Sequence, residues 1–440
     1  MTTVGIPDTD DPTALHGLAK DRFRAGDYDV ALRCLQALLL RWPADTSAWQ
    51  DLAIVLHNVG ATCVNARVPG AAIRPLRTAL AIDPALAPAR AALAEALFGE
   101  GRRLVDLGRY DEAVALYTRA AAIQPDRHDI RYYAMFAHLW RDDYAAAWDP
   151  EVWRRVFCAV SPRLWDGQSD VADMLVTHEN GLGDLLQFAR CLPGLAGRFG
   201  RIFLRTNARC LPLLRNPHLR LFGGALADRI TVLGPDEEVA YDRHCELFGL
   251  FMATGLTPGT LTTRPPYLSV AEPLKAAWAA VLDAHAAGRR LRVGLSWGAL
   301  GGGANPRTVD ATALRPLLDH FPDVLFVCLQ ADEAKAGLFA GPPADNLLDL
   351  GVRDIAATAA VIANLDLVVV ADSGLAHLAG ALGTEVWLLL GRLCDWRWHR
   401  AGVTSDWYPQ ARLFRQEVDG DWSGPVAAVE AALRHRTGRP

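Results

Sequence analysis

A glycine-bearing loop at residues 178–184 (HENGLGD) places the carboxylate of Asp184 beside the start of an apolar helical stretch. Gly181 and Gly183 allow the backbone to turn sharply and to approach a ligand closely. The amino end of a helix favours an anion or a developing negative charge. Asp184 is therefore a candidate for chemistry on a bound ligand, with first-turn capping of the helix as the structural alternative.

A second loop, residues 371–377 (ADSGLAH), follows an apolar run and also opens a helical stretch. Asp372 and Ser373 could cap that helix, whose free N–H groups would then face a phosphate. His377 comes four residues after Ser373, on the same face of the helix. It could bind a diphosphate, or it could be an interior histidine with a partner inside the protein.

The third loop leaves the apolar run 291–298 (LRVGLSWG) and contains three successive glycines, at 301–303. Arg307 is the one cation in this loop. A guanidinium aimed at a pyrophosphate stabilises the charge that develops when a nucleotide leaves. The alternative is a flexible surface loop with an exposed arginine.

Parallel α/β sheets are the elements that we expect to position these loops. After about residue 165, short apolar runs alternate with helical stretches, which indicates parallel sheets covered on both faces. In doubly wound sheets, ligands bind at the carboxyl ends of the strands, where all three loops lie. Two series of strands, joined around residues 263–278, predict two Rossmann-like lobes with a cleft between them. The predicted strands lie within residues 173–178, 201–207, 229–234, 291–298, 324–330, 346–351, 365–372 and 385–391.

The first third of the chain is an internal repeat with a period of 41 residues. The pattern resembles the tetratricopeptide repeat, whose usual period is about 34 residues. The extra residues amount to about two helical turns, so the first helix of a pair can lengthen near residues 61–67 and 101–107 without rotating its apolar face. Each copy carries a small residue and, twelve positions later, a proline: Ala31 and Pro43, Ala72 and Pro84, Ala113 and Pro125.

Asp143, Tyr144 and Ala147 indicate the start of a fourth, incomplete repeat that caps the array. We expect the array to recruit a protein or peptide through a concave groove. The alternative is a spacer or dimerisation element, because apolar stripes are needed merely to pack the repeats together. The sequence therefore leaves open whether the protein forms a homo-oligomer.

Composition excludes several classes of protein. The net charge of −5 argues against a nucleic-acid-binding surface. The first residues show no export signal, and no stretch of 18 apolar residues predicts a transmembrane segment. The eight cysteines form no C-x-x-C pair, so we expect no structural metal and a cytoplasmic location.

The three loops together carry a resemblance to a known family, and this resemblance indicates the function. GLGD…QF.R.LP, GLSW…NPRTV and DSGLAHLAGALG occur in this order with domain-sized spacing. They resemble the heptosyltransferase-type enzymes of glycosyltransferase family 9, which have the GT-B fold, and above all the branch with an amino-terminal tetratricopeptide array. The resemblance covers roughly residues 130–425. That branch also shares PRLWDG at 162–167, DWRW at 395–398, WYPQARLFRQ at 407–416 and GDW at 420–422.

The resemblance implies a role for individual residues. Asp184 corresponds to the general base that deprotonates the acceptor hydroxyl. Ser296 corresponds to a hydroxyl at the end of a strand, and Arg307 to a cation facing the donor phosphates. The residues implied to hold the donor diphosphate are Asp372, Ser373, Gly374 and His377; further site residues are Asp395 and Trp396 of the DWRW segment.

This sequence departs from the branch at two places. Residues 299–304 (ALGGGA) replace a polar, charge-rich loop, which leaves donor affinity and catalytic competence open. Arg392 stands where relatives often have an aromatic residue, and it could replace a lost phosphate contact or be surface decoration. Four tryptophans near the end could include a stacking platform, but we expect most of them to lock the carboxyl-terminal segment against the lobes. They are Trp396, Trp398, Trp407 and Trp422.

We therefore predict a helical-repeat domain at 1–150, an acceptor-side lobe at 151–288 and a nucleotide-sugar lobe at 289–440. The expected activity is transfer of a sugar from a nucleoside-diphosphate sugar to a hydroxyl, on a protein recruited by the array. No D-x-D motif precedes the loops within the two predicted lobes, so we expect no required metal or cofactor. The alternatives are a catalytically silent scaffold, which residues 299–304 favour, and a GT-B nucleotide-sugar epimerase, which the loops fit less well.

Overall fold

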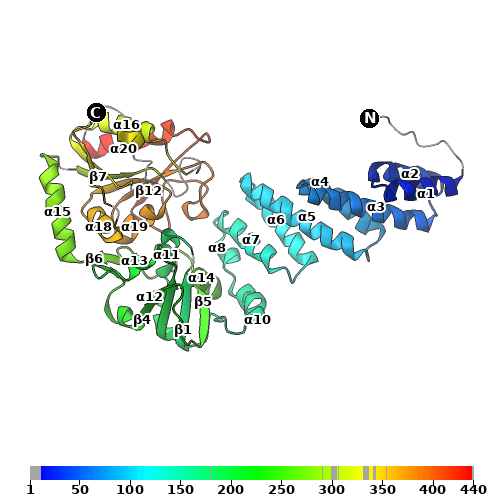
Figure 1. Cartoon of the computed structure of the whole chain (residues 1–440), viewed down its shortest axis with the longest axis horizontal. Coiled ribbons are helices and arrows are strands. Elements are labelled where there is room, and N and C mark those ends of the chain that lie inside the picture. Colours follow the sequence, from blue (N-terminus) through cyan, green and yellow to red (C-terminus); the bar gives the residue numbers. More distant parts are fainter. Residues whose placement is uncertain are drawn as a thin grey trace. The chain divides into compact units, whose positions relative to one another are not determined.

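The computed structural model describes residues 11–438 except 179, 290, 299–304, 306, 331–335, 340–342 and 353. Two compact units make up the chain, and they divide between Arg141 and Asp142 (Figure 1). This division precedes residue 150, where the sequence predicts the end of the helical domain. The boundaries of the three predicted domains stay predictions.

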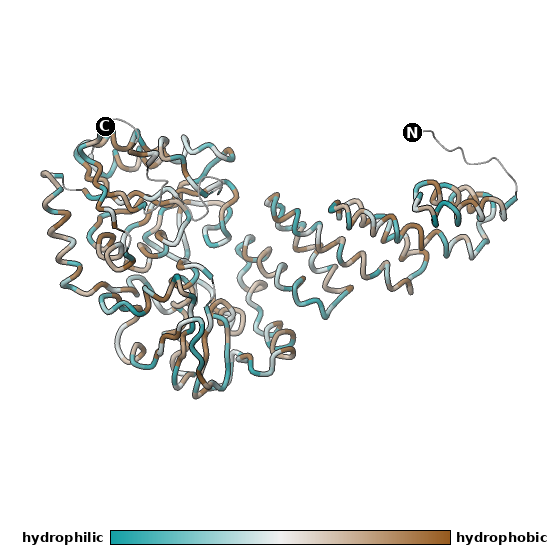
Figure 2. The backbone as a smooth tube through the Cα atoms, in the orientation of Figure 1, coloured by the Kyte–Doolittle hydropathy of each residue, from teal (hydrophilic) through white to brown (hydrophobic). Residues whose placement is uncertain are grey.

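The first unit consists of helices paired along the chain, each pair joined by a short turn. Helices α3 and α5 are each 20 residues long and end at the predicted sites of lengthening. Figure 2 shows hydrophobic and hydrophilic stretches alternating along these helices, as amphipathic packing requires. The bounds are α1 (Pro12–Arg24), α2 (Tyr28–Arg41), α3 (Thr46–Asn65), α4 (Pro69–Ile82), α5 (Ala87–Asp106), α6 (Tyr110–Ile123) and α7 (His128–Leu139).

Small residues set the distance between the helices of each pair. The three repeat alanines are fully buried, so they face the core of the array. A Cβ on Gly60 of α3 would lie 2.4 Å from Leu76 Cγ of α4. One period later, a Cβ on Gly101 of α5 would lie 2.6 Å from Tyr117 Cε1 of α6. The repeat is thus visible in the packing as well as in the sequence.

The second unit contains two parallel sheets. The first has the order β4-β2-β1-β5, and its strands lie within residues 151–288. The second has the order β12-β11-β10-β7-β8-β9, and its strands lie within residues 289–440. The strands of the first are β1 (Val171–His178), β2 (Phe199–Thr206), β4 (Ile230–Leu233) and β5 (Arg243–Glu246); those of the second are β7 (Leu291–Ser296), β8 (Val324–Cys328), β9 (Leu347–Asp349), β10 (Leu367–Ala371), β11 (Val386–Leu390) and β12 (Ala411–Arg415).

Burial explains which strands the sequence reveals. Every residue of β8, β10 and β11 is buried, and these strands are continuous apolar runs. The edge strands β5 and β12 were not predicted, because both carry charged residues. A small antiparallel pair, β3 (Leu219–Leu221) with β6 (Leu268–Val270), was not predicted either.

Helices connect the strands. α11 (Leu182–Ala189) follows β1, and α19 (Gly374–Leu382) follows β10, as predicted for the first two loops. The observed order confirms the predicted fold class of a helical repeat followed by the two Rossmann-like lobes of a GT-B fold. The remaining helices are α8 (Tyr144–Ala147), α9 (Pro150–Val152), α10 (Cys158–Val160), α12 (Leu192–Leu195), α13 (Leu211–Leu214), α14 (Gly249–Thr254), α15 (Glu272–Ala286), α16 (Arg315–His320), α17 (Ala336–Phe339), α18 (Ile355–Ile362) and α20 (Ser423–Thr437).

The residues predicted to start a fourth repeat belong to the second unit. α8 spans only four residues, with Asp143 accepting a hydrogen bond from Ala146 N–H as its cap. The Tyr144 ring lies edge-on to Trp407 at 6.4 Å, and the Trp148 ring lies edge-on to Trp396 at 6.0 Å. This segment therefore contributes to an aromatic core of the second unit. None of the described helices has the length and apolar character needed to cross a bilayer.

Candidate active site

A cavity of about 620 Å³ lies where the carboxyl ends of strands from both sheets meet. The loop after β1 supplies its lining from the first sheet; the loops after β7, β8, β10 and β11, together with α18, supply it from the second. The sequence analysis predicted a cleft at this position. The predicted site residues in the lining are Gly181, Gly183, Asp184, Ser296, Arg307, Asp372, Ser373, Gly374, His377 and Asp395.

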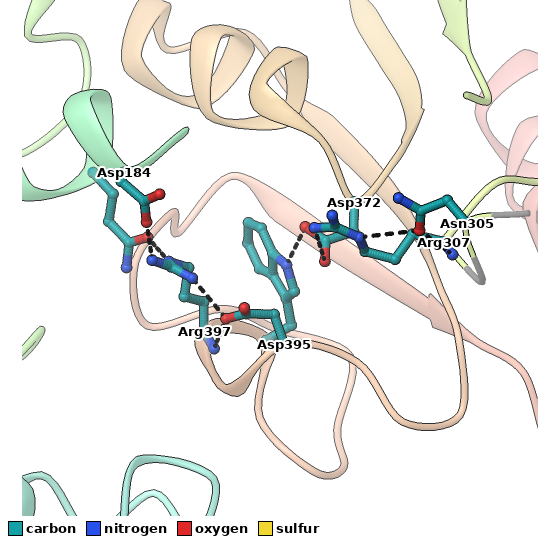
Figure 3. Close-up of polar contacts among 8 residues, drawn as sticks. Asp184, Asn305, Arg307, Asp372, Asp395 and Arg397 are labelled. Carbon is teal, nitrogen blue, oxygen red and sulfur yellow. Dashed lines mark hydrogen bonds and ion pairs between the residues drawn. The ribbon is translucent and has the colours of Figure 1, made fainter. Parts of the chain in front are cut away.

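Asp184 lies in the first turn of α11 and faces the cavity (Figure 3). Its Oδ2 accepts a hydrogen bond from Gly181 N–H at 3.3 Å, so the carboxylate does cap its own helix. Its Oδ1 accepts a hydrogen bond from Arg397 Nη2. A quarter of the side chain is exposed. Capping and access to a ligand therefore coexist at this residue.

Asp372 follows β10 and is almost fully buried. Its Oδ1 accepts a hydrogen bond from Trp398 Nε1 at 2.9 Å, and its Oδ2 lies 3.7 Å from Arg307 Nη1. Burial raises the pKa of Asp372 to about 6, and the nearby carboxylate of Asp395 adds to the rise. Asp372 therefore contacts two other side chains of the site, Trp398 and Arg307.

Ser373 occupies the N-cap position of α19, but its side chain makes no capping hydrogen bond. Ser373 is thus the N-cap residue, as the sequence indicated, but neither its side chain nor that of Asp372 makes a capping hydrogen bond to this helix. Asp372 is already engaged by Trp398 and Arg307. Ser373 Oγ is buried without a hydrogen-bond partner among the described residues. A buried hydroxyl at a helix N-terminus that lines a cavity is suited to an anionic ligand.

His377 lies one turn further along α19 and is buried. Its Nδ1 makes a 2.9 Å hydrogen bond with Tyr408 Oη, which lies 3.4 Å from Tyr267 Oη. Burial lowers the pKa of His377 to about 3, and the charge of Arg397 contributes. The ring is therefore neutral near pH 7 and offers one N–H donor without a positive charge. His377 is thus an interior histidine that also lines the cavity, and diphosphate binding by it stays a prediction.

Ser296 ends β7, and its hydroxyl donates a 3.0 Å hydrogen bond to Gln330 Oε1. The same oxygen accepts the N–H groups of Trp297 at 3.1 Å and Gly298 at 2.9 Å. A Cβ on Gly298 would lie 2.5 Å from Gln330 Nε2, so the backbone approaches this side chain closely. Gln330 thus fixes the start of the loop that leads to Arg307.

Arg307 supplies a partly exposed cation to the cavity, because 47% of its side chain is accessible. Asn305 Oδ1 accepts a 3.0 Å hydrogen bond from Arg307 N–H and a 3.4 Å one from its Nε. Asp372 restrains the other end of the guanidinium (Figure 3). The predicted glycine-rich loop at 299–304 lies outside the described residues.

Two of the additional candidates do not line the cavity. Arg392 makes an exposed 2.7 Å ion pair with Asp419, so the structure places it with the surface alternative. Trp396 is buried and packs against Phe188, 6.3 Å away between ring centroids. The other three tryptophans of the carboxyl-terminal group are buried as well, which confirms the expected locking role: Trp398, Trp407 and Trp422.

Sequence reasoning assigned no role in the site to Arg397, Gln330 or Tyr408, and it indicated Trp398 only as one of four tryptophans, not as a partner of Asp372. Arg397 is the only cation of the DWRW segment. A single arginine between an aspartate and two tryptophans indicates a buried ion pair, and this was the signal that could have identified it. Gln330 and Tyr408 act through backbone or histidine partners, and no spacing rule predicts such contacts. Among the described residues, no group of three His, Cys, Asp or Glu side chains is arranged to hold a metal ion. Metal independence stays a prediction.

Two protein families match segments of the chain. Residues 94–127 match the tetratricopeptide repeat, and residues 324–392 match glycosyltransferase family 9 (heptosyltransferase). The latter range includes β8 to β11 and the loop from Asp372 to His377. Protein FlbA of Caulobacter vibrioides is 28% identical over 297 residues, which cover 61% of this chain and 48% of FlbA. The chain thus spans about half the length of this curated relative.

Solved structures show distant likenesses. E. coli ADP-heptose LPS heptosyltransferase II is 18% identical, covering 60% of this chain and 99% of its own, with a TM-score of 0.41. The O-GlcNAc transferase of Thermobaculum terrenum is 15% identical, covering 86% of this chain and 82% of its own, with a TM-score of 0.24.

Proposed function

Since the chain carries a tetratricopeptide repeat and a glycosyltransferase family 9 domain, we propose that it transfers a sugar from a nucleoside-diphosphate sugar to an acceptor hydroxyl. The donor binds at the carboxyl ends of β7, β8 and β10. The acceptor approaches from the side of the first sheet, where Asp184 faces the same cavity.

The hydroxyl of Ser373, which has no hydrogen-bond partner within the described part of the chain, is the observation that carries this proposal. It lies at the N-terminus of α19, where backbone N–H groups and the helix dipole attract an anion. Arg307 lines the same cavity and supplies a positive charge. A diphosphate is the anion that uses a helix N-terminus, a hydroxyl and a guanidinium together. The neutral imidazole of His377 adds a hydrogen-bond donor.

The chemistry follows from the two sides of the cavity. Asp184 accepts the proton of the acceptor hydroxyl as the oxygen attacks the sugar. The bond between the sugar and the diphosphate breaks, and the departing diphosphate gains negative charge. Arg307 and the α19 N–H groups stabilise that charge, because they are already in place before the reaction. The chain's own residues provide both functions without a metal ion, which is part of the proposal.

The acceptor is a protein or peptide recruited by the helical array, and the enzyme works in the cytoplasm. The presence of at least one tetratricopeptide repeat supports recruitment, since stacked repeats form extended concave binding surfaces. Intact-mass analysis of proteins that co-purify with the wild type, compared with those from Asp184→Ala, tests this part. A mass increase of one sugar unit that depends on Asp184 is expected. Unmodified partners in both preparations would contradict a protein acceptor.

Calorimetric titration with a panel of ADP-, GDP- and UDP-linked sugars tests donor binding directly. The proposal predicts saturable binding of at least one donor and weaker binding by Arg307→Ala. Binding of no member of the panel would favour the catalytically silent scaffold. Chelation with EDTA before the titration should leave both binding and transfer unchanged, and loss of transfer would contradict metal independence.

A further inference from the structure

We propose that Arg397 is the positioning residue for Asp184: it orients the carboxylate from the opposite lobe, so that one oxygen is ready to accept the acceptor proton. This inference rests on the proposed transferase function. It assigns a role to a side chain that lines the cavity and that the sequence analysis left without one.

The guanidinium of Arg397 is engaged on three sides. Its Nη2 donates to Asp184 Oδ1, and its Nε donates to Gln187 Oε1. Both acceptors lie on α11, which belongs to the first lobe. Its Nη1 donates to Asp395 Oδ1 at 2.9 Å within the second lobe. Arg397 therefore joins the two lobes at the cavity itself (Figure 3).

Aromatic rings hold the guanidinium in this place. Its central carbon lies 5.2 Å from the Phe188 ring centroid and 4.7 Å from that of Trp396. Only 14% of the Arg397 side chain is exposed. A cation packed against two rings and bound to three acceptors has little freedom to turn. The position of Asp184 Oδ1 is consequently determined by the second lobe.

The second oxygen of Asp184 is left for chemistry. Oδ2 accepts the 3.3 Å hydrogen bond from Gly181 N–H. Each carboxylate oxygen has two lone-pair sites, so Oδ2 can still accept a proton. Because Arg397 binds Oδ1, the carboxyl group cannot rotate freely, and the lone pairs of Oδ2 keep a fixed orientation. Small misplacement of a reacting group reduces rate far more than it reduces ligand binding.

Arginine is required here for its shape as well as its charge. A planar guanidinium reaches Asp184, Gln187 and Asp395 at once, whereas a lysine ammonium is a compact charge on a flexible stem. Arg397→Lys therefore keeps the positive charge and loses the geometry. Arg201→Lys is the matched control: Arg201 binds Asp173 with two nitrogens, near the amino ends of β1 and β2 and outside the cavity lining.

The test measures donor affinity by calorimetry and turnover by release of nucleoside diphosphate, with the sugar nucleotide that binds best in the panel. We expect Arg397→Lys to lower kcat by about 100-fold and to change the donor Kd less than about threefold. Arg201→Lys should match the wild type in both. Guanidinium at a non-denaturing concentration should restore part of the turnover of Arg397→Ala, which a merely structural role would not produce.

Each outcome decides the proposal. Wild-type kcat in Arg397→Lys, or absence of guanidinium rescue in a folded Arg397→Ala, overturns it while the transferase function stands. Absence of donor binding and turnover in the wild type overturns the proposed function and this inference together. If the arginine variants fail to fold, Gln187→Met removes one acceptor at nearly constant volume. A reduced kcat at unchanged Kd then supports the proposal, and wild-type kcat overturns it.

Discussion

The guanidinium of Arg397 is hydrogen-bonded to the carboxylate of Asp184, although 213 residues separate the two in the chain. The next residue, Trp398, donates a hydrogen bond to Asp372 on the other side of the cavity. One short segment, the 3₁₀ turn Trp396–Trp398, therefore binds two of the aspartates that line the cavity, Asp184 and Asp372. Its own placement depends on burial of its two tryptophans. A buried aromatic segment therefore positions side chains from both lobes at this site.

Gly183→Ala should disrupt the site. A Cβ at this position would lie 2.6 Å from His377 Cδ2, and the buried ring has little room to move. We expect a loss of about 1–3 kcal/mol in the free energy of unfolding. Urea denaturation followed by tryptophan fluorescence measures it, because most tryptophans lie in the second unit. Gly181→Ala is the control: φ is −80° and nothing lies within 4 Å of the added Cβ. Equal stability of the two variants would contradict the close approach.

His377→Gln should make the second unit less sensitive to acid. The folded-state pKa of about 3 lies below the ordinary value of 6.5. As the pH falls below 6.5, His377 binds a proton in the unfolded chain but stays neutral in the folded chain, so the wild type loses stability. By pH 5 this loss is about 2 kcal/mol relative to the variant. Urea unfolding of both proteins from pH 7 to pH 5 measures the difference, and parallel curves would contradict a neutral buried imidazole.

Asp372→Asn should have the opposite effect on the pH dependence. The folded-state pKa of about 6 lies above the ordinary value of 3.8. Between these values the folded chain binds a proton that the unfolded chain does not, so the wild type gains stability as the pH falls. The gain relative to the variant is about 2 kcal/mol at pH 4. The same unfolding experiment measures this gain. If the stability of the wild type relative to the variant decreased as the pH fell, burial would not be raising the pKa of Asp372.

Gly101→Ala should destabilise the helical array although alanine is the better helix former. The added Cβ would lie 2.6 Å from Tyr117 Cε1, whose ring is fully buried between α5 and α6. The expected cost is about 1–3 kcal/mol. Gly17→Ala in α1 is the control, because nothing lies within 4 Å of its Cβ; it should gain about 0.5–1 kcal/mol. Urea unfolding followed by far-ultraviolet circular dichroism measures both, and stabilisation by Gly101→Ala would contradict the packing.

The elements that the sequence analysis predicted are those whose own residues determine them. β8 and β10 are unbroken apolar runs because both faces are covered, and the lengthened α3 and α5 follow from a repeat with extra residues. The charged edge strand β5 (RHCE) has no such pattern. It forms a strand because it pairs with β1, and the sequence of β5 alone does not reveal that pairing. α8 was interpreted as part of the array, but its neighbouring tryptophan packs on residues more than 200 positions away.

The candidate site divides in the same way. Asp184, Ser373 and Gly374 were predicted, because loops after buried strands and before helices carry ligands in α/β sheets. The contacts of Arg397 with Asp184 and of Trp398 with Asp372 were not predicted, since each joins residues far apart in the chain and no local pattern encodes it. Arg392 was a candidate on charge alone, and its pairing with Asp419 is equally a tertiary contact.

Transfer and donor binding measured side by side in Asp184→Ala test the central claim most directly. The account predicts that the variant binds the nucleoside-diphosphate sugar with nearly the wild-type Kd, because Ser373, Arg307 and α19 are untouched. It predicts that transfer to the acceptor falls by at least about 100-fold, the lower range for loss of a general base. Transfer at the wild-type rate by a variant that still binds the donor would contradict the assignment of Asp184 as the base.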